Sequence, residues 1–142
     1  METVNCIDKI MFANMVLNAA AKLSAEKAGV DSLNVFPVPD GDTGTNMSLT
    51  MNSAAKFVSR LEGEGDVAKI AEQMAYGALM GARGNSGVIL SQILGGFANA
   101  LSNKTEITAP DLAEGFSGGV GAAYKAVVKP MEGTILTVAR EA

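Results

Sequence analysis

The stretch CIDKIMFANMVLNAAAKLSAEKA, residues 6–28, predicts a long first helix and sets the expectation of an all-α fold. Its apolar residues recur every three or four positions, which is the spacing of the buried face of an amphipathic helix. These residues are Ile7, Ile10, Met11, Met15, Ala19 and Leu23, and Phe12 and Val16 widen the stripe. Gly29 follows, and a glycine just past such a run usually ends the helix. We therefore expect this helix to stop at Ala28.

Five further helices are expected after the first, with connections short enough for antiparallel neighbours. Their expected ranges are 46–61, 67–81, 85–101, 109–128 and 134 onward. Asn46, Asp66 and Thr108 stand where N-cap residues are preferred. Because no segment predicts a persuasive strand, the expected fold is all-α, an up-and-down antiparallel helical bundle.

The composition excludes several classes of protein. The chain has 142 residues, 48% hydrophobic and 18% charged, which fits one folded domain spanning 1–142. A net charge of −4 argues against a nucleic-acid partner. The absence of histidine excludes a His-based triad and a His-ligated zinc site. A lone cysteine, no basic leader and no 20-residue apolar run predict a cytoplasmic protein with no membrane span.

The loop NVFPVPDGDTGTN, residues 34–46, is the strongest candidate for chemistry. Its two prolines forbid an interior helix. Asp40 and Asp42 flank a glycine that permits a tight turn, so both carboxylates could face one Mg²⁺ ion. The helix expected next would direct backbone N–H groups at a phosphate. These groups belong to Thr43, Gly44, Thr45 and Asn46. The alternative is an ordinary surface turn, because Asp-Gly is a common turn dipeptide.

A second segment, GARGNSG at residues 81–87, also leads into a helix. Small residues let the backbone of Asn85, Ser86 and Gly87 approach an anion, Ser86 adds a hydroxyl, and Arg83 adds a positive charge suited to phosphate. It is not a Walker A loop, since no lysine follows the glycines. The alternative is a plain helix–helix turn with Arg83 in solvent. Together, the acidic loop and the glycine turn favour a site for a metal ion and phosphate.

A third segment, around Gly133 and Thr134, gives a weaker signal. The Thr134 hydroxyl could contact a nucleotide. An ordinary helix cap explains the same residues.

Three stretches, residues 34–47, 80–92 and 129–139, closely resemble the N-terminal nucleotide-binding domain of the bacterial fatty acid kinases. That domain is similar in turn to the L subunit of dihydroxyacetone kinase. The resemblance covers nearly the whole chain. It implies a barrel of eight antiparallel helices, of which about six are present here, with ATP or ADP and two Mg²⁺ ions at one end. It also implies phosphoryl transfer to a fatty acid presented by a separate fatty-acid-binding protein, giving an acyl phosphate.

The resemblance also assigns residues. Asp40 and Asp42 match the metal-binding aspartates, and the nearest match to a third, upstream aspartate of dihydroxyacetone kinase is Asn34. Thr43 replaces a histidine of that subfamily, and both departures favour the fatty acid kinase branch. Ser86 and its neighbour Gly87 match the phosphate-contacting turn. Arg83 is a candidate for stabilising charge during transfer.

Alternatives remain open at this point. They are transfer of the dihydroxyacetone kinase type, a module that binds ADP without transferring phosphate, and a purely structural helical domain. Because the last helix has no terminating signal, we expect a fragment of a longer chain with further C-terminal domains. An apolar flank left by two missing helices predicts self-association, for example as a homodimer.

Overall fold

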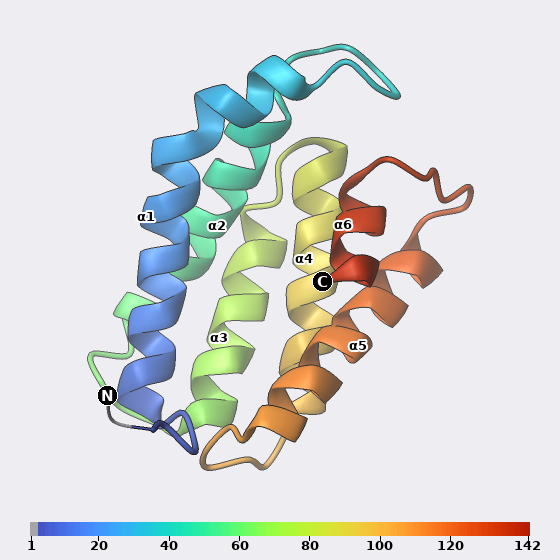
Figure 1. The fold of residues 1–142 in the computed structure, drawn as a ribbon. Helices are drawn as coiled ribbons and strands as arrows, with labels where there is room; N and C mark the ends of the chain where they lie inside the picture. The colour runs from blue at the N-terminus through green and yellow to red at the C-terminus, as the bar shows by residue number, and fades with distance from the viewer. Residues whose placement is uncertain (1–2) are drawn as a thin grey trace.

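The computed structural model describes residues 3–142, and this part of the chain forms six helices, which confirms the all-α prediction. Each helix packs against the next, and successive helices run in opposite directions (Figure 1). The helices are α1 (Lys9–Leu33), α2 (Thr43–Ser59), α3 (Val67–Met80), α4 (Gly84–Ala100), α5 (Ala109–Ala126) and α6 (Ile135–Glu141). Outside the helices, the described residues pair only through an isolated antiparallel bridge between Ile7 and Ile107.

Two helix boundaries differ from the prediction in a way that matters for the site. Helix α1 continues through Gly29 to Leu33, because its last turn packs closely on Gly44 of α2 and tertiary contact outweighs the local stop signal. Helix α2 begins at Thr43 with Asp42 as its N-cap. The prediction that Asn46 is the N-cap is therefore wrong, and Asn46 lies in the first turn of the helix.

The other helix boundaries lie closer to the predicted ones. Helix α4 begins at Gly84, one residue earlier than expected, and α5 ends at Ala126, two residues earlier. The caps read from the sequence at the other two positions are confirmed. The Asp66 side chain accepts a hydrogen bond from the Lys69 N–H, and the Thr108 side chain accepts one from the Asp111 N–H in a capping box.

The main core lies between α1, α2, α3 and α4, with α5 packed against α4. Leu101, Ile107, Val67 and Thr50 are its largest fully buried side chains. Thr50 is the one polar member of this group, so its hydroxyl has to be satisfied inside the protein.

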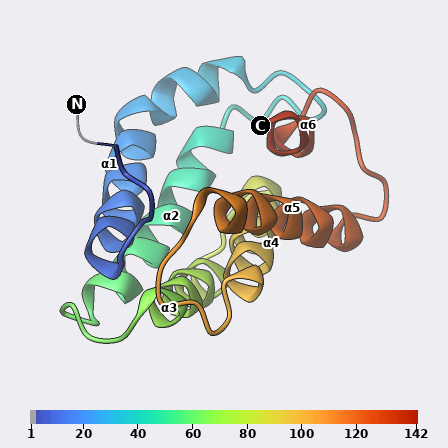
Figure 2. The same ribbon diagram turned by 60° about the horizontal axis from the view of Figure 1, so that its bottom comes forward.

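Three segments far apart in the sequence gather at one end of the bundle (Figures 1 and 2). They are the loop after α1, the start of α4 and the loop that leads into α6. The start of α1 lies at the opposite end, next to the α2–α3 and α4–α5 connections (Figure 1). No helix among residues 3–142 has both the length and the apolar character that crossing a bilayer requires.

Candidate functional site

Asn34 closes the acidic loop on itself. Its side-chain N–H donates to the Val38 carbonyl (3.0 Å), and its Oδ1 accepts from the backbone N–H groups of Asp42 (3.0 Å) and Thr43 (3.2 Å). The bend between these contacts carries Asp40, with Gly41 at φ 65°. Because the amide oxygen already accepts two N–H donors, a metal ion would have to displace one of them. The metal-ligand role of Asn34 therefore stays a prediction, and its observed role is to fix the loop.

Asp31 is a second residue that holds this part of the chain in place, and the sequence did not predict its role. From the last turn of α1, its carboxylate accepts the Thr45 N–H (2.9 Å) and the Thr45 hydroxyl (2.6 Å). The hydrogen bond from the Thr45 hydroxyl is the main cause that lowers the pKa of Asp31 from its usual value, and the Thr45 N–H adds to it. No local signal marked Asp31, because the predicted helix stopped three residues before it.

The side chains of Asn34 and Asp31 accept hydrogen bonds from backbone N–H groups at the start of α2. A helix leaves its first N–H groups without intrahelical partners. Here the N–H groups of Asp42 and Thr43 go to Asn34 and that of Thr45 goes to Asp31. The Asn46 N–H donates to the Asp42 carbonyl (2.9 Å). A phosphate contact from Thr43, Gly44, Thr45 or Asn46 stays a prediction, and for Thr43, Thr45 and Asn46 it would require an exchange of partners.

The carboxylates of Asp40 and Asp42 are themselves available. Both residues are exposed, and no hydrogen bond or ion pair within residues 3–142 involves either side-chain carboxylate. The described residues contain no cluster of three acidic, histidine or cysteine side chains that would form a ready metal cage. Two carboxylates fit Mg²⁺ in particular, because this ion is usually held by one or two carboxylates together with substrate phosphates and water.

Helix α4 starts differently from α2. Its N-cap residue Arg83 has an extended backbone and makes no side-chain cap. Within the described residues, the backbone N–H groups of Gly84, Asn85 and Ser86 have no protein acceptor. Free N–H groups and the positive end of the helix dipole make such a start suited to an anion. Arg83, the residue directly before this helix start, is exposed and carries a positive charge.

The structure brings the two segments together. The Ser86 hydroxyl donates a long hydrogen bond to the Thr43 carbonyl (3.4 Å). The Arg83 N–H donates to Thr50 Oγ1 (3.1 Å). Gly84 faces the Asn46 side chain so closely that a Cβ there would overlap it. The start of α2, which directly follows the acidic loop, and the glycine turn are thus in contact at the N-terminal ends of α2 and α4.

Comparison with known proteins places the chain in a family. The family model described as "DAK2 domain" matches residues 37–142, a range that includes both the acidic bend and the glycine turn. The chain belongs to the DAK2 domain family.

Curated relatives of this DAK2 domain are much longer proteins. The protein YloV of Bacillus subtilis is 51% identical over 140 residues, which are 99% of this chain and 25% of YloV. An uncharacterised protein of Staphylococcus saprophyticus is 52% identical over 98% of the chain, and one of Staphylococcus aureus is 50% identical over 98%. The DAK2 domain described here therefore spans about a quarter of the length of the curated relatives it matches, and these relatives contain further sequence.

The third predicted segment reaches the same end of the DAK2 domain but is used as a cap. Thr134 is the N-cap of α6, where its hydroxyl donates to the Met131 carbonyl (2.7 Å) and accepts from the Leu136 N–H (3.3 Å). Nearby, Arg140 makes a two-pronged ion pair with Glu132 (2.6 and 2.9 Å) that ties the preceding loop to α6. A nucleotide contact from Thr134 stays a prediction.

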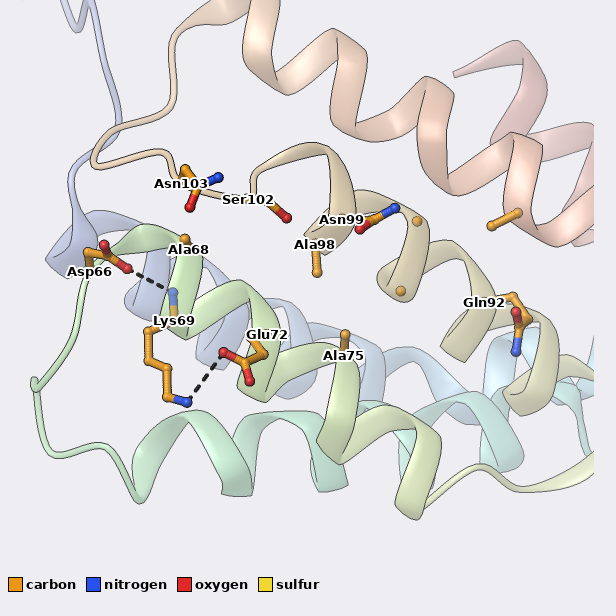
Figure 3. A pocket seen from close by; sticks show the side chains of 13 residues that line it. Asp66, Ala68, Lys69, Glu72, Ala75, Gln92, Ala98, Asn99, Ser102 and Asn103 are labelled. Carbon is orange, nitrogen blue, oxygen red and sulfur yellow. Dashed lines mark hydrogen bonds and ion pairs between the residues drawn. The ribbon is translucent and has the colours of Figure 1, made fainter.

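An open groove of the DAK2 domain lies elsewhere. This groove, with a volume of about 720 Å³, is lined by Asp66, α3, α4, the loop after α4 and Ala122 of α5 (Figure 3). Its charged groups are already engaged, because Lys69 pairs with Glu72 (3.3 Å) and Asp66 caps α3. It sits at the opposite end of the bundle from the acidic loop, so the groove is not part of the candidate site.

Proposed function

We propose that this DAK2 domain binds ATP with Mg²⁺ and acts in phosphoryl transfer, as the nucleotide-binding part of a longer kinase. The observation that carries the proposal is the meeting of an acidic loop with an uncapped helix start, through Ser86 and Thr43. One half offers carboxylates for a cation and the other offers N–H groups for an anion. That is the pair of functions that a metal-bound polyphosphate requires.

In this proposal Asp40 and Asp42 hold Mg²⁺, with Asn34 keeping their loop closed. When bound, the ion neutralises negative charge on the phosphates, which is the chemistry it supplies. The N–H groups at the start of α4 and the Ser86 hydroxyl orient the phosphate chain, and Arg83 stabilises charge that develops during transfer. Phosphoryl transfer needs little covalent chemistry from the protein, so positioning and charge compensation account for most of the work.

We propose further that the acceptor is a fatty acid carried by a separate binding protein, which would give an acyl phosphate. Support for this comes from the motif resemblance. The chain has no histidine, and in this proposal the carboxylates of Asp40 and Asp42 hold the metal ion, so neither is free to act as a general base. A carboxylate acceptor is already ionised at neutral pH and needs no base to become a nucleophile. Dihydroxyacetone, the acceptor suggested by the related L subunit, carries a hydroxyl group whose proton has to be removed.

The central test is Mg²⁺·ADP binding by calorimetry. We expect Asp42→Ala to lose affinity by at least about tenfold, since removal of even an indirect partner of a bound metal typically costs 10–100-fold. Far-UV circular dichroism should show unchanged helix content. Asp66→Asn is the matched control, because it removes one negative charge at the far end of the bundle. Equal affinity of the wild type and Asp42→Ala would contradict the assignment.

A single-turnover assay separates the kinase from a module that only holds ADP. The full-length protein is mixed with labelled ATP, a fatty acid and its carrier protein, and acyl phosphate is measured. Label appearing in acyl phosphate supports the fatty acid kinase proposal, whereas label in dihydroxyacetone phosphate in a parallel reaction supports the related activity. Binding of ADP with no transfer in either reaction would indicate a nucleotide-holding module.

A further inference from the structure

We propose that Thr50 is a positioning residue that couples α2 to the start of α4 and so holds the phosphate-facing N–H groups opposite the acidic loop. The inference rests on the proposed function and adds to it a buried residue that touches neither metal nor nucleotide. Thr50 is completely buried and lies about two turns into α2.

The Thr50 hydroxyl uses both of its hydrogen-bonding capacities. It donates to the carbonyl of Asn46, one turn earlier in α2 (2.8 Å), and accepts the backbone N–H of Arg83 (3.1 Å). A hydroxyl is one donor with acceptor lone pairs, so one side chain can join two backbone segments in this way. Arg83 is the N-cap of α4 and directly precedes the three free N–H groups. Thr50 therefore fixes the position of Arg83, and with it the start of α4.

The packing around Thr50 leaves little freedom at this junction. Gly87, in the first turn of α4, lies so close to Thr50 Oγ1 that a Cβ there would overlap it. Gly84 lies equally close to the Asn46 side chain. The start of α4 thus packs directly against the turn of α2 from Asn46 to Thr50. The Thr50 hydroxyl adds a hydrogen bond to this contact.

An apolar side chain of the same shape cannot replace this contact. Thr50→Val keeps the volume but removes the acceptor, which leaves the Arg83 N–H without its partner. Thr50→Ser keeps the hydroxyl and loses a methyl group. The two variants therefore separate the hydrogen bond from the packing.

The test compares Mg²⁺·ADP and AMP binding by calorimetry in the wild type, Thr50→Val and Thr50→Ser. We expect Thr50→Val to bind Mg²⁺·ADP about tenfold more weakly, the size of effect that one unpaired and partly buried donor produces. The loss should be smaller for AMP, and Thr50→Ser should restore most of the affinity. Ser91→Ala is the matched control, because Ser91 is also buried but its hydroxyl bonds only within α4, to the Val88 carbonyl. A purely structural role for Thr50 would lower stability without changing the ratio of ADP to AMP affinity.

Amide hydrogen exchange gives a second readout that needs no ligand. The Arg83 N–H should be protected in the wild type and in Thr50→Ser, and should exchange faster in Thr50→Val. Wild-type affinity in a folded Thr50→Val protein, or an unprotected Arg83 N–H in the wild type, would overturn the inference. If Thr50→Val does not fold, wild-type exchange and the Thr50→Ser affinities decide. If the wild type binds no Mg²⁺·ADP, the proposed function fails, while the exchange data still decide whether Thr50 couples the two helices.

Discussion

Two glycine-to-alanine substitutions, one in α1 and one in α2, should change stability in opposite directions. Gly29 lies inside α1, exposed, with open space where a Cβ would go. Gly44 lies in the first turn of α2 and is buried. A Cβ on Gly44 would overlap the Lys27 carbonyl and come within 2.9 Å of the Val30 Cβ.

The expected magnitudes follow from these surroundings. Gly29→Ala gains the helix propensity of alanine and meets no obstacle, so it should stabilise the protein by about 0.5–1 kcal/mol. Gly44→Ala gains at most a similar amount. Its methyl group meets rigid backbone, and overpacking of this kind typically costs about 1–3 kcal/mol. The net effect at Gly44 should be a loss of about 1–2 kcal/mol.

Urea unfolding followed by far-UV circular dichroism measures both changes on one scale. The denaturation midpoint should rise for Gly29→Ala and fall for Gly44→Ala, with the slope unchanged in each. Gly44→Ala should also weaken Mg²⁺·ADP binding, because it separates Thr45 from Asp31 at the start of α2. Gly29→Ala should bind as the wild type does.

An unexpected stability change in either variant would contradict the packing described for Gly29 and Gly44. A destabilised Gly29→Ala protein would mean that Gly29 needs a left-handed conformation and ends α1, as the sequence alone suggested. A Gly44→Ala protein as stable as the wild type would mean that α2 does not rest on the last turn of α1.

Two further predictions concern the side chains that hold the loop. The pKa of Asp31 is lowered by the Thr45 hydroxyl, so its carboxylate stabilises the fold above its unfolded-state pKa and this contribution is lost as the pH falls through the lower folded-state value. Acid unfolding below about pH 4 should therefore be less steep in Asp31→Asn than in the wild type; identical pH profiles would refute this. Asn34→Ala should open the acidic loop, seen as faster limited proteolysis within residues 35–42 and as weaker Mg²⁺·ADP binding with little change in helix content; an equally resistant loop would show that Asn34 is not needed to close it.

Much of the fold could be predicted because its signals are local. Asp66 and Thr108 cap their helices within three residues of themselves, and helical spacing together with such end signals located every helix. The predicted buried face of α1 was wrong in part, because the structure buries Phe12, Val16 and Ala20 but leaves Ile10, Met11 and Met15 exposed. The stop at Gly29 was wrong because a contact with α2, fifteen residues away at Gly44, decides it. Local propensity is a weak guide wherever such contacts exist.

The site could be predicted in its parts but not in its connections. The acidic loop and the glycine turn are recognisable from glycine, proline and carboxylate spacing, and the structure places them together. The links that hold them join residues far apart in the sequence. Asp31 bonds Thr45 fourteen residues on, and Thr50 bonds Arg83 thirty-three residues on. A threonine inside a helix carries no sign of such a role, because its usual bond is to its own preceding turn.

The starts of α2 and α4 are expected to bind different parts of the ligand. At α2 the first N–H groups are taken by Asn34 and by the Asp31 carboxylate, so negative charge already compensates that helix dipole and a phosphate gains little there. At α4 the N–H groups are left without protein acceptors among the described residues, and the N-cap residue Arg83 carries a guanidinium. A phosphate is therefore expected at α4 and the metal ion at the acidic loop. Because a diphosphate can offer one phosphate to each, whereas a monophosphate has to share one between them, we expect ADP to be the shortest nucleotide that uses the whole site.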